Sequence, residues 1–494
     1  MDIVWNEETK VKEIAAVIVE DNAAPKRVNR WLVLANVSVG TFMATLDGSI
    51  ANVALPTIAE ELQSPVHVVQ WVLTSYLLTI CALLPIMGKI SDLLGRSRIY
   101  NFGFLIFTAG SALCGLSDTL ALLIAARIVQ AAGAACLMSN SQAIVAELFA
   151  GGGRGRALGI VGTVVSLGSL TGPAIGGILV GSLGWPSIFW INVPIGIAGM
   201  IAGWFILPRH SGKRAQEPFD FRGSVLFIVG IVAFLFTVSN GQDWGWSSPA
   251  TWVLGLGALA VLGWFYLWEK KTRYPMLDFG LYRIRAFAFG NMAALLSFVA
   301  LFCTNVMMPF YMQNVLHYSP EKTGYAMMLY PLTMAVIAPL SGWLSDKIGY
   351  IWLTTTGLAV NAAAFALLNT LTTQESVWTV GLHLALFGLG AGLFQSPNNS
   401  SVMEAVPRSK LGTAGGLNAL VRNIGMVLGI ALSVSLYSTR LYQSGTISGA
   451  DPAADPQAVL SALHWVFWTA MAICLLALFF SSLRIRSKEP SAQN

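Results

Sequence analysis

Fourteen runs of mostly apolar residues, each roughly 20 residues long, constrain this chain more than any other feature. A helix needs about 20 apolar residues to cross the hydrocarbon core of a bilayer, so each run predicts one membrane-spanning helix. The runs cover residues 31–55, 68–90, 99–117, 120–141, 157–181, 188–207, 223–241, 250–268, 286–312, 324–345, 351–370, 377–398, 411–437 and 463–483. The sequence therefore predicts an all-α membrane protein with fourteen spans.

The composition supports this prediction and excludes other classes of protein. Only 11% of the 494 residues are charged and 55% are hydrophobic, whereas soluble domains carry about 25% charged residues. So few charges cannot cover a water-exposed surface, which excludes a soluble enzyme, a disordered chain and a secreted disulfide scaffold. The five cysteines lie inside apolar runs without a CxxC spacing, so we expect neither a disulfide framework nor a metal site.

The basic residues predict the orientation in the membrane. With the N-terminus in the cytoplasm, 25 of the 29 Lys and Arg residues fall in cytoplasmic segments, and only Lys322 and Arg440 fall outside. Such a bias is typical of multi-pass proteins of the plasma or bacterial inner membrane, here with both termini cytoplasmic. It also accounts for the net charge of +5 without a nucleic-acid partner. The short loops and the lack of a GxxxxGK[ST] string argue against an ATP-driven pump.

The first six and the last six runs are copies of each other. Eight residues between Tyr76 and Gly95 recur between Tyr330 and Gly349 at a constant offset. Both copies start on the same side of the membrane, which predicts two six-helix halves with a substrate site between them. The predicted division is an N-terminal tail at 1–30, the first half at 31–208, two inserted spans with linkers at 209–285, the second half at 286–484 and a C-terminal tail at 485–494.

A polar turn follows the second run. It contains Gly88, Asp92, Gly95, Arg96 and Arg98. Glycines permit a tight turn, and Asp92 can pair with Arg96 as a breakable latch. This string resembles the loop motif of the major facilitator superfamily. The second copy keeps Asp346 but has Tyr350 where Arg96 stood, so we expect the second latch to be weaker.

The fifth run contains a pattern of small residues with a proline. It consists of Gly168, Gly172, Pro173, Gly176 and Gly177. Small residues four apart let helices approach closely, and Pro173 bends the helix. Ordinary close packing would also produce such a pattern. The motif resembles the one that marks drug/proton antiporters, and with fourteen spans it points to the multidrug efflux branch of the superfamily.

Two charged residues lie deep inside spans of the first half. Asp47 is the one acid well within a run, and Arg127 lies at a similar depth in the fourth run. An arginine in mid-membrane costs at least ~2.5 kcal/mol unless it is paired or hydrated. We expect the two side chains to meet and to couple transport to protons, with a static buried ion pair as the alternative. Glu147 and Glu404 are expected to form surface pairs with nearby Arg and Lys residues. For Arg422 two alternatives stay open, a pair with Glu404 or binding to lipid.

Polar, aromatic and methionine side chains of the central spans are candidates for a substrate cavity. Flexible thioethers and aromatic rings suit a site that repacks around varied ligands, although core or lipid-facing packing explains any one of them. The candidates are Gln130, Phe302, Met307, Phe310, Tyr311, Tyr330, Phe394, Gln395 and Asn398.

The resemblance implies a transporter and not an enzyme. It implies proton-coupled export of lipophilic, often cationic, drugs by alternating access, without a cofactor or metal and with the proton gradient as the energy source. The expected partners are a small-molecule substrate, protons and the lipid bilayer, and the protein is expected to function as a monomer. The alternatives are an antiporter for one narrow class, such as a tetracycline–metal complex, a host antibiotic or a siderophore, and a nutrient/proton symporter.

Overall fold

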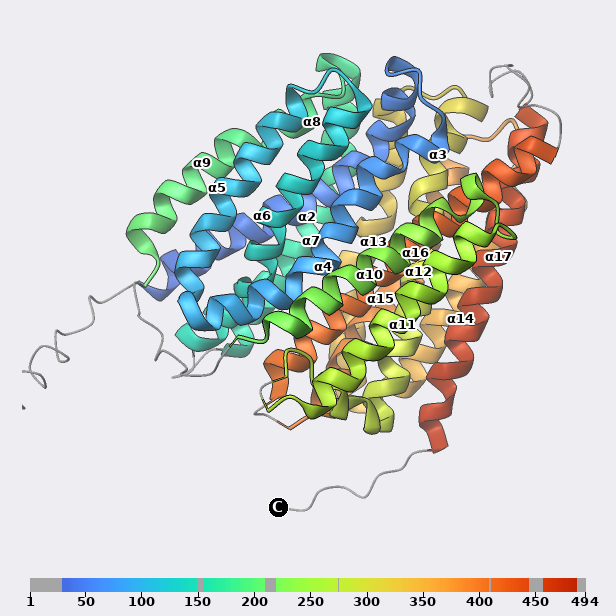
Figure 1. Ribbon diagram of the computed structural model, residues 1–494. Helices are drawn as coiled ribbons and strands as arrows, with labels where there is room; N and C mark the ends of the chain where they lie inside the picture. Colours follow the sequence, from blue (N-terminus) through green and yellow to red (C-terminus); the bar gives the residue numbers. More distant parts are fainter. Residues whose placement is uncertain are drawn as a thin grey trace, which may run out of the picture.

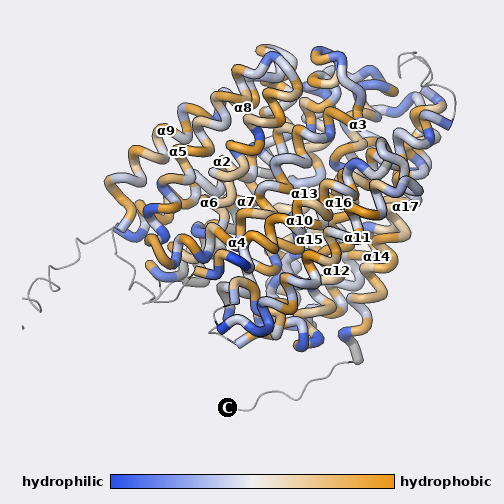
Figure 2. Tube along the Cα trace, in the orientation of Figure 1, coloured by the Kyte–Doolittle hydropathy of each residue, from blue (hydrophilic) through white to orange (hydrophobic). Residues whose placement is uncertain are grey.

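A computed structural model describes residues 29–149, 154–208, 219–273, 275–407, 410–443 and 456–486. All secondary structure within these residues is helical, and the long helices run side by side as one bundle (Figure 1). The hydrophilic residues gather near the two ends of the bundle, and the middle is dominated by apolar residues (Figure 2). This distribution is that of a protein whose middle belt faces lipid.

Each of the fourteen predicted runs corresponds to a long helix or to a helix with a short preceding turn. The first half contains α2 (Arg30–Glu61), α3 (Val66–Val69), α4 (Trp71–Leu94), α5 (Arg96–Gly115), α6 (Leu120–Leu148), α7 (Arg154–Leu183), α8 (Ser187–Trp190) and α9 (Asn192–Ile206). The inserted segment contains α10 (Phe221–Trp244), α11 (Pro249–Lys271) and the 3-10 turn η1 (Phe279–Arg283). The second half contains α12 (Arg285–Phe310), the π-helical η2 (Tyr311–Val315), α13 (Pro320–Ile348), α14 (Tyr350–Leu368), α15 (Val377–Glu404), α16 (Leu411–Gln443), α17 (Pro456–Ser482) and η5 (Leu483–Arg486).

Twelve helical segments of the described residues are long and apolar enough to cross a membrane. The other two predicted runs form α5 and α7, which pack inside the same bundle against α6 and α2. The helices extend several residues beyond most of the predicted runs, because hydropathy ends where the lipid ends while the helix continues to its cap. Asn29, Ser248 and Ser376 are such caps, each accepting a hydrogen bond from a backbone N–H of the first turn.

The repeat is visible in the backbone. Gly95 separates α4 from α5 with φ of 100°, and Gly349 separates α13 from α14 with φ of 85°. Only glycine adopts these angles without strain, so the same sharp turn requires the same residue in both halves. The two halves meet through α7 with α13, α4 with α16 and α2 with α12.

The inserted helices cover one of the two seams between the halves. Helix α10 packs against both α4 and α16, and α11 packs mainly on α10 (Figure 1). Trp71 on α4 contacts the ring of Phe236 on α10, and Trp246 lies near the hydroxyl of Ser435 on α16. The α7–α13 seam has no comparable cover among the described helices.

Candidate functional site

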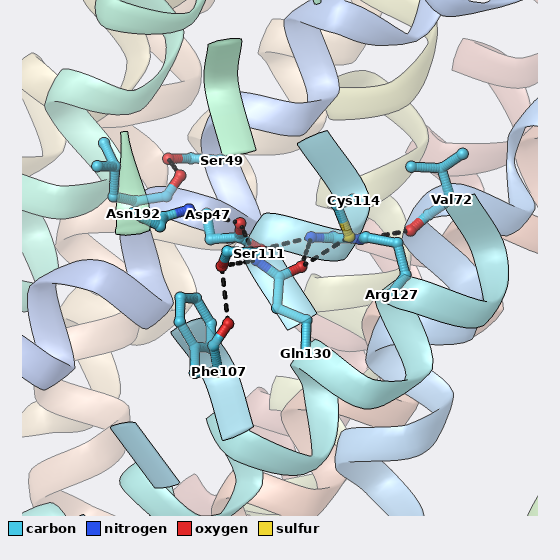
Figure 3. Close-up of polar contacts among 10 residues, drawn as sticks. Asp47, Ser49, Val72, Phe107, Ser111, Cys114, Arg127, Gln130 and Asn192 are labelled. Carbon is cyan, nitrogen blue, oxygen red and sulfur yellow. Dashed lines mark hydrogen bonds and ion pairs between the residues drawn. The ribbon is translucent and has the colours of Figure 1, made fainter. Parts of the chain in front are cut away.

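Asp47 on α2 and Arg127 on α6 form an ion pair inside the first half (Figure 3). Arg127 Nη1 lies 2.5 Å from Asp47 Oδ2, and neither side chain has any exposed surface. The two residues thus meet as their similar depths suggested. Their contact fits both a proton-coupling site and a static ion pair.

The second carboxylate oxygen of Asp47 accepts two amide hydrogen bonds. Gln130 Nε2 donates to Oδ1 at 2.7 Å, and Asn192 Nδ2 donates to the same oxygen at 3.0 Å. Gln130 also donates to Ser111 Oγ at 2.8 Å and accepts from Arg127 Nη1 at 2.7 Å. Four helices, α2, α5, α6 and α9, therefore hold one carboxylate.

Arg127 is fixed on its other side by α4. Its Nε donates to the carbonyl oxygen of Val72 at 2.9 Å, and its guanidinium lies 4.1 Å from the ring centroid of Tyr76. Phe189 on α8 lies 5.6 Å away. Buried ion pairs repay their desolvation only when the remaining donors and acceptors are also satisfied, and this network satisfies most of them.

Sequence reasoning identified Asp47 and Arg127 as a pair. It assigned Gln130 to the substrate cavity, and it missed Ser111 and Asn192 as members of the network. Asn192 stands in the string Asn192-Val193-Pro194 at the start of α9, where a polar residue and a proline fall within an apolar run. That string was the available signal. A single serine in an apolar run offers none, because Ser111 is one of many small polar residues in these spans.

A cavity of about 920 Å³ lies between the two halves. Asn52 on α2 and Asn305 on α12 both line it, at equivalent positions of the repeat. Tyr76 and Arg127 form part of its wall, whereas Asp47 is not among its lining residues. Arg127 therefore lies between the cavity and the carboxylate, although its own side chain has no exposed surface.

The cavity extends to the end of the bundle that carries the loop motif, where Asp92 and Arg96 line it. At the opposite end the halves are closed by α7 against α13. A Cβ added at Gly177 would meet the carbonyl of Pro320 at 2.5 Å, and one at Gly324 would overlap the carbonyl of Pro173. The structure is therefore open toward the loop-motif end and closed at the other.

The small-residue motif of α7 packs against α2 within the first half and against α13 of the second half. Gly168, Gly172 and Gly176 face α2, where an added Cβ would overlap Thr45, Ser49 and Ile50 respectively. Gly177 instead faces α13 in the other half. The motif is thus close packing within the first half and, one residue further on, the closure between the halves.

Three of the nine predicted cavity residues line the cavity, namely Phe302, Tyr330 and Gln395. The other predictions are corrected by the structure, because these side chains lie elsewhere. Gln130 binds Asp47 instead, and the remaining five are buried away from the cavity: Met307, Phe310, Tyr311, Phe394 and Asn398.

The rotation of each helix about its axis explains why some of the predicted residues do not line the cavity. The cavity face of α12 runs through Phe298, Leu301, Phe302 and Asn305, and a residue two positions further along points the other way. Tyr311 donates its hydroxyl proton to the carbonyl of Thr372 at 2.6 Å. Asn398 accepts a hydrogen bond from Arg484 and donates to the carbonyl of Gly290, so its polar atoms are used within the second half.

The loop motif forms the predicted pair, but inside one half. Arg96 Nη2 lies 2.9 Å from Asp92 Oδ1, and Arg96 Nη1 lies 3.3 Å from Glu147 Oε2. All three belong to the first half, and Glu147 pairs with Arg96. The side chains of Arg154 and Arg156, the partners predicted for Glu147, lie outside the described part. These exposed pairs are worth ~1 kcal/mol or less each. Arg98 is exposed, and Gly88 lines the cavity.

The second copy of the motif differs. The side chain of Asp346 lies outside the described residues. Lys347 stands over the ring of Trp343 at 3.9 Å, and Tyr350 replaces the arginine. Nothing in the described part reproduces the Asp92–Arg96 pair.

The predicted surface pair of Glu404 is also absent from the described residues. Glu404 is exposed, and Arg408 lies outside the described part. Lys410 instead binds Asp278 of the linker at 2.6 Å. That hydrogen bond from Lys410 holds the pKa of the Asp278 carboxyl below its ordinary value.

Comparisons with known proteins agree with this architecture. A sequence model of the Major Facilitator Superfamily matches residues 37–430 and again residues 290–494. The riboflavin transporter RibZ of Clostridioides difficile is 34% identical over 94% of this chain and 99% of its own length. The multidrug transporter protein MdtP of Bacillus subtilis is 34% identical over 84% of this chain and 76% of its own.

A third relative carries a resistance name. The multidrug resistance protein Stp of Mycobacterium tuberculosis is 33% identical over 83% of this chain and 76% of its own length. With its two similar halves, its central cavity and these relatives, the chain belongs to the Major Facilitator Superfamily, in the branch of multidrug efflux transporters.

Proposed function

We propose that this protein exports lipophilic organic compounds across the cell membrane in exchange for protons, by alternating access. The observation that carries the proposal is the buried Asp47–Arg127 pair, whose arginine lines the central cavity while its carboxylate does not. Relatives named for multidrug transport and multidrug resistance support this proposal. The tetracenomycin C resistance and export protein of Streptomyces glaucescens, 30% identical over 85% of this chain, adds to that support.

A proton reaching Asp47 changes the contacts between helices. Protonation neutralises the partner of Arg127, so the guanidinium must find other partners or water, because an uncompensated buried charge is costly. Arg127 is also bonded to Val72 on α4, and α4 forms one seam with α16. A proton at Asp47 therefore biases the seam, and through it the balance between the two cavity openings.

The orientation follows from the charge bias. If the basic segments are cytoplasmic, the loop-motif end and both termini face the cytoplasm. The open cavity of this structure is then the state in which an exporter loads cargo from the cell. Outward release requires opening the α7–α13 contact at the other end.

The charges that line the cavity do not favour the cationic cargo that the resemblance implies. The one acid among its described lining residues, Asp92, is paired with Arg96. No lining carboxylate in the described part is free to bind a cation. The cavity thus gives no support to a preference for cationic drugs, and lipophilic cargo without a positive charge fits it better.

A transporter for one narrow class, or a proton symporter for a nutrient, is the second candidate. It is favoured by the riboflavin transporter, whose whole length this chain matches. The two candidates differ in the direction of proton-driven flux and in the number of compounds carried.

The test uses everted membrane vesicles that contain the full chain, with an acid interior and a panel of neutral, cationic and anionic dyes. We expect uptake of several dyes that stops when an uncoupler removes the proton gradient, and no uptake in vesicles lacking the protein. Uptake that ignores the uncoupler would contradict proton exchange. Loss of preloaded riboflavin driven by the same acid interior, with no dye uptake, would favour the symporter.

A further inference from the structure

Arg422 is a second arginine in the cavity wall, and it belongs to the second half. It lies on α16 about eleven residues from the start of the helix, roughly 17 Å from the loop-motif end. Ala419, Asn423 and Met426 lie on the same helix face and also line the cavity. The Arg422 side chain is partly accessible, and this accessible surface faces the cavity.

Within the described part of the chain, Arg422 makes no hydrogen bond, ion pair or ring contact. A guanidinium at this depth is expensive unless a counter-charge or water meets it. Arg127 shows how the fold provides such a counter-charge, through Asp47. For Arg422 the described protein provides none, so the partner has to come from the cavity.

The charges of the cavity favour an anionic partner. The charged residues among its described lining are Lys89, Asp92, Arg96, Arg127 and Arg422. Four of these five are basic. Arg96 pairs with Asp92 and Arg127 pairs with Asp47, whereas Arg422 has no acidic partner among the described residues. A cleft lined mainly by one sign of charge raises the local concentration of ions of the opposite sign.

Two aromatic residues line the same cavity as Arg422. Phe298 and Phe302 of α12 lie with their Cβ atoms against Gly425 and Gly429, the glycines that follow Arg422 on α16. The neighbouring α12 and α16 surfaces thus give the cavity two phenylalanines and one guanidinium. Flexible thioethers add to this apolar wall, from Met138, Met276, Met327, Met334, Met403 and Met426.

We propose that Arg422 is a cargo-binding residue that holds the negative group of a planar aromatic organic anion, such as a carboxylate or sulfonate. The ring system of the cargo lies against Phe298 and Phe302. A guanidinium suits this role because it donates two parallel hydrogen bonds to such a group and keeps its charge. The inference rests on the proposed function in one respect, that the central cavity carries the cargo.

The repeat supplies a matched control. Arg422 stands three residues before Gly425, and Val165 stands three residues before Gly168 in the other half. Val165 also lines the cavity. Val165→Met and Arg422→Met therefore place the same side chain on opposite walls, and only the second removes a charge.

The experiment measures binding to the purified full-length protein in lipid nanodiscs. The probes are pyrene-1-sulfonate, an anion, and pyrene-1-methanol, which has the same ring system without a charge. We expect Arg422→Met to weaken sulfonate binding about tenfold or more, with less than about a twofold change for the alcohol. Arg422→Lys should retain only part of the sulfonate affinity, because lysine keeps the charge but loses the two parallel hydrogen bonds. Val165→Met should leave the ratio of the two affinities unchanged.

Equal weakening of both probes by Arg422→Met would overturn the proposal, since it would indicate a structural role. An unchanged sulfonate affinity would overturn it as well. If Arg422→Met does not fold, the wild-type protein still decides: pyrene-1-sulfonate should protect Arg422 from phenylglyoxal, as measured by peptide mass. Equal modification with and without the sulfonate contradicts the proposal and leaves a small inorganic anion or a lipid phosphate as the partner.

These binding measurements need no proton gradient. A protein that binds the sulfonate through Arg422 but moves no dye in acid-loaded vesicles retains this inference and loses the proposed export. Proton-driven transport of the alcohol, without any preference for the sulfonate in binding, would support the proposed export and overturn this inference.

Discussion

The two arginines of the cavity wall have opposite surroundings. Arg127, in the first half, has no exposed surface and is held by Asp47, Gln130, Val72 and Tyr76. Arg422, in the second half, faces the cavity and has no partner within the described residues. Residues of the protein balance the charge of Arg127, whereas the charge of Arg422 is available to a molecule that enters the cavity.

This difference indicates a division of work between similar halves. The first half holds a carboxylate behind an arginine, where a proton can alter helix contacts without touching cargo. The second half presents a charge directly to the cavity. Protonating Asp47 would leave a second unpaired arginine near an anionic cargo, so release of that cargo must come from a change of cavity shape and not from charge repulsion.

The largest effect is expected from removing the titratable group of the first half. Asp47→Asn keeps the shape and the hydrogen-bonding capacity of the side chain but cannot release a proton. Proton-driven uptake of pyrene-1-methanol into everted vesicles should fall by about tenfold or more, a size typical of a lost coupling energy. Asp47→Glu should retain part of the uptake.

A neutral probe is required for that measurement, because a charged dye would also respond to the changed field of the cavity. Downhill exchange of the alcohol serves as the control for folding and should survive in Asp47→Asn. Uptake at the wild-type rate would place the proton site elsewhere and would make Asp47–Arg127 a static ion pair.

The second effect tests whether the two arginines differ as their contacts suggest. Arg127→Lys cannot reach Asp47, Gln130 and Val72 together, so buried acceptors lose their donors at about 1–3 kcal/mol each. Arg422→Lys breaks no contact within the described protein. Thermal unfolding in detergent should therefore show a clearly lower midpoint for Arg127→Lys and almost no shift for Arg422→Lys. Similar shifts would show that Arg422 has a structural partner.

A smaller effect is expected at the glycines that close the bundle. Gly177→Ala places a Cβ 2.5 Å from the Pro320 carbonyl, whereas Gly416 on α16 has no atom within 4 Å of its Cβ position. Overpacking against backbone costs about 1–3 kcal/mol, partly offset by the better helix propensity of alanine. Gly177→Ala should open the α7–α13 end, and Gly416→Ala should not.

A cysteine placed at Asn305, which lines the cavity, reports that opening. In intact cells an impermeant maleimide should label it several-fold faster in the Gly177→Ala background than in the Gly416→Ala background, since 1.4 kcal/mol is about tenfold in an equilibrium. Equal rates would mean that α7 closes the bundle elsewhere along its length.

Much of this fold could be predicted from hydropathy and repetition. The apolar runs became helices, and the offset of the repeat predicted which helices are equivalent. The depth of Asp47 and Arg127 predicted their meeting, because depth along a helix is counted directly from the sequence. The rotation of each helix about its axis cannot be counted from the sequence, because contacts with other helices determine it.

Rotation accounts for the errors in the predicted cavity. Phe302 lines the cavity and Met307 does not, although both lie in the same apolar run. The sequence located Arg422 inside a span, but it could not show that Arg422 lines the cavity without a partner among the described residues. A sequence reports the residues that are present, whereas an unpaired charge is recognised only when its surroundings are known.

The smallest effect is expected at the loop motif, where the halves differ again. The cavity reaches this end while the Asp92–Arg96 pair is intact, and both residues belong to the first half. Breaking the pair therefore cannot be a requirement for opening this end. We expect the pair instead to hold Arg96 where it contacts the other half once that end closes.

Because both side chains are more than a third exposed, Asp92→Asn should cost at most ~1 kcal/mol of the closed state. Labelling of the Asn305→Cys reporter in everted vesicles should rise by about two- to fivefold with Asp92→Asn. It should change less with Asp346→Asn, because Tyr350 stands where the arginine would be. Equal changes would show that both copies of the motif act alike, despite the missing arginine.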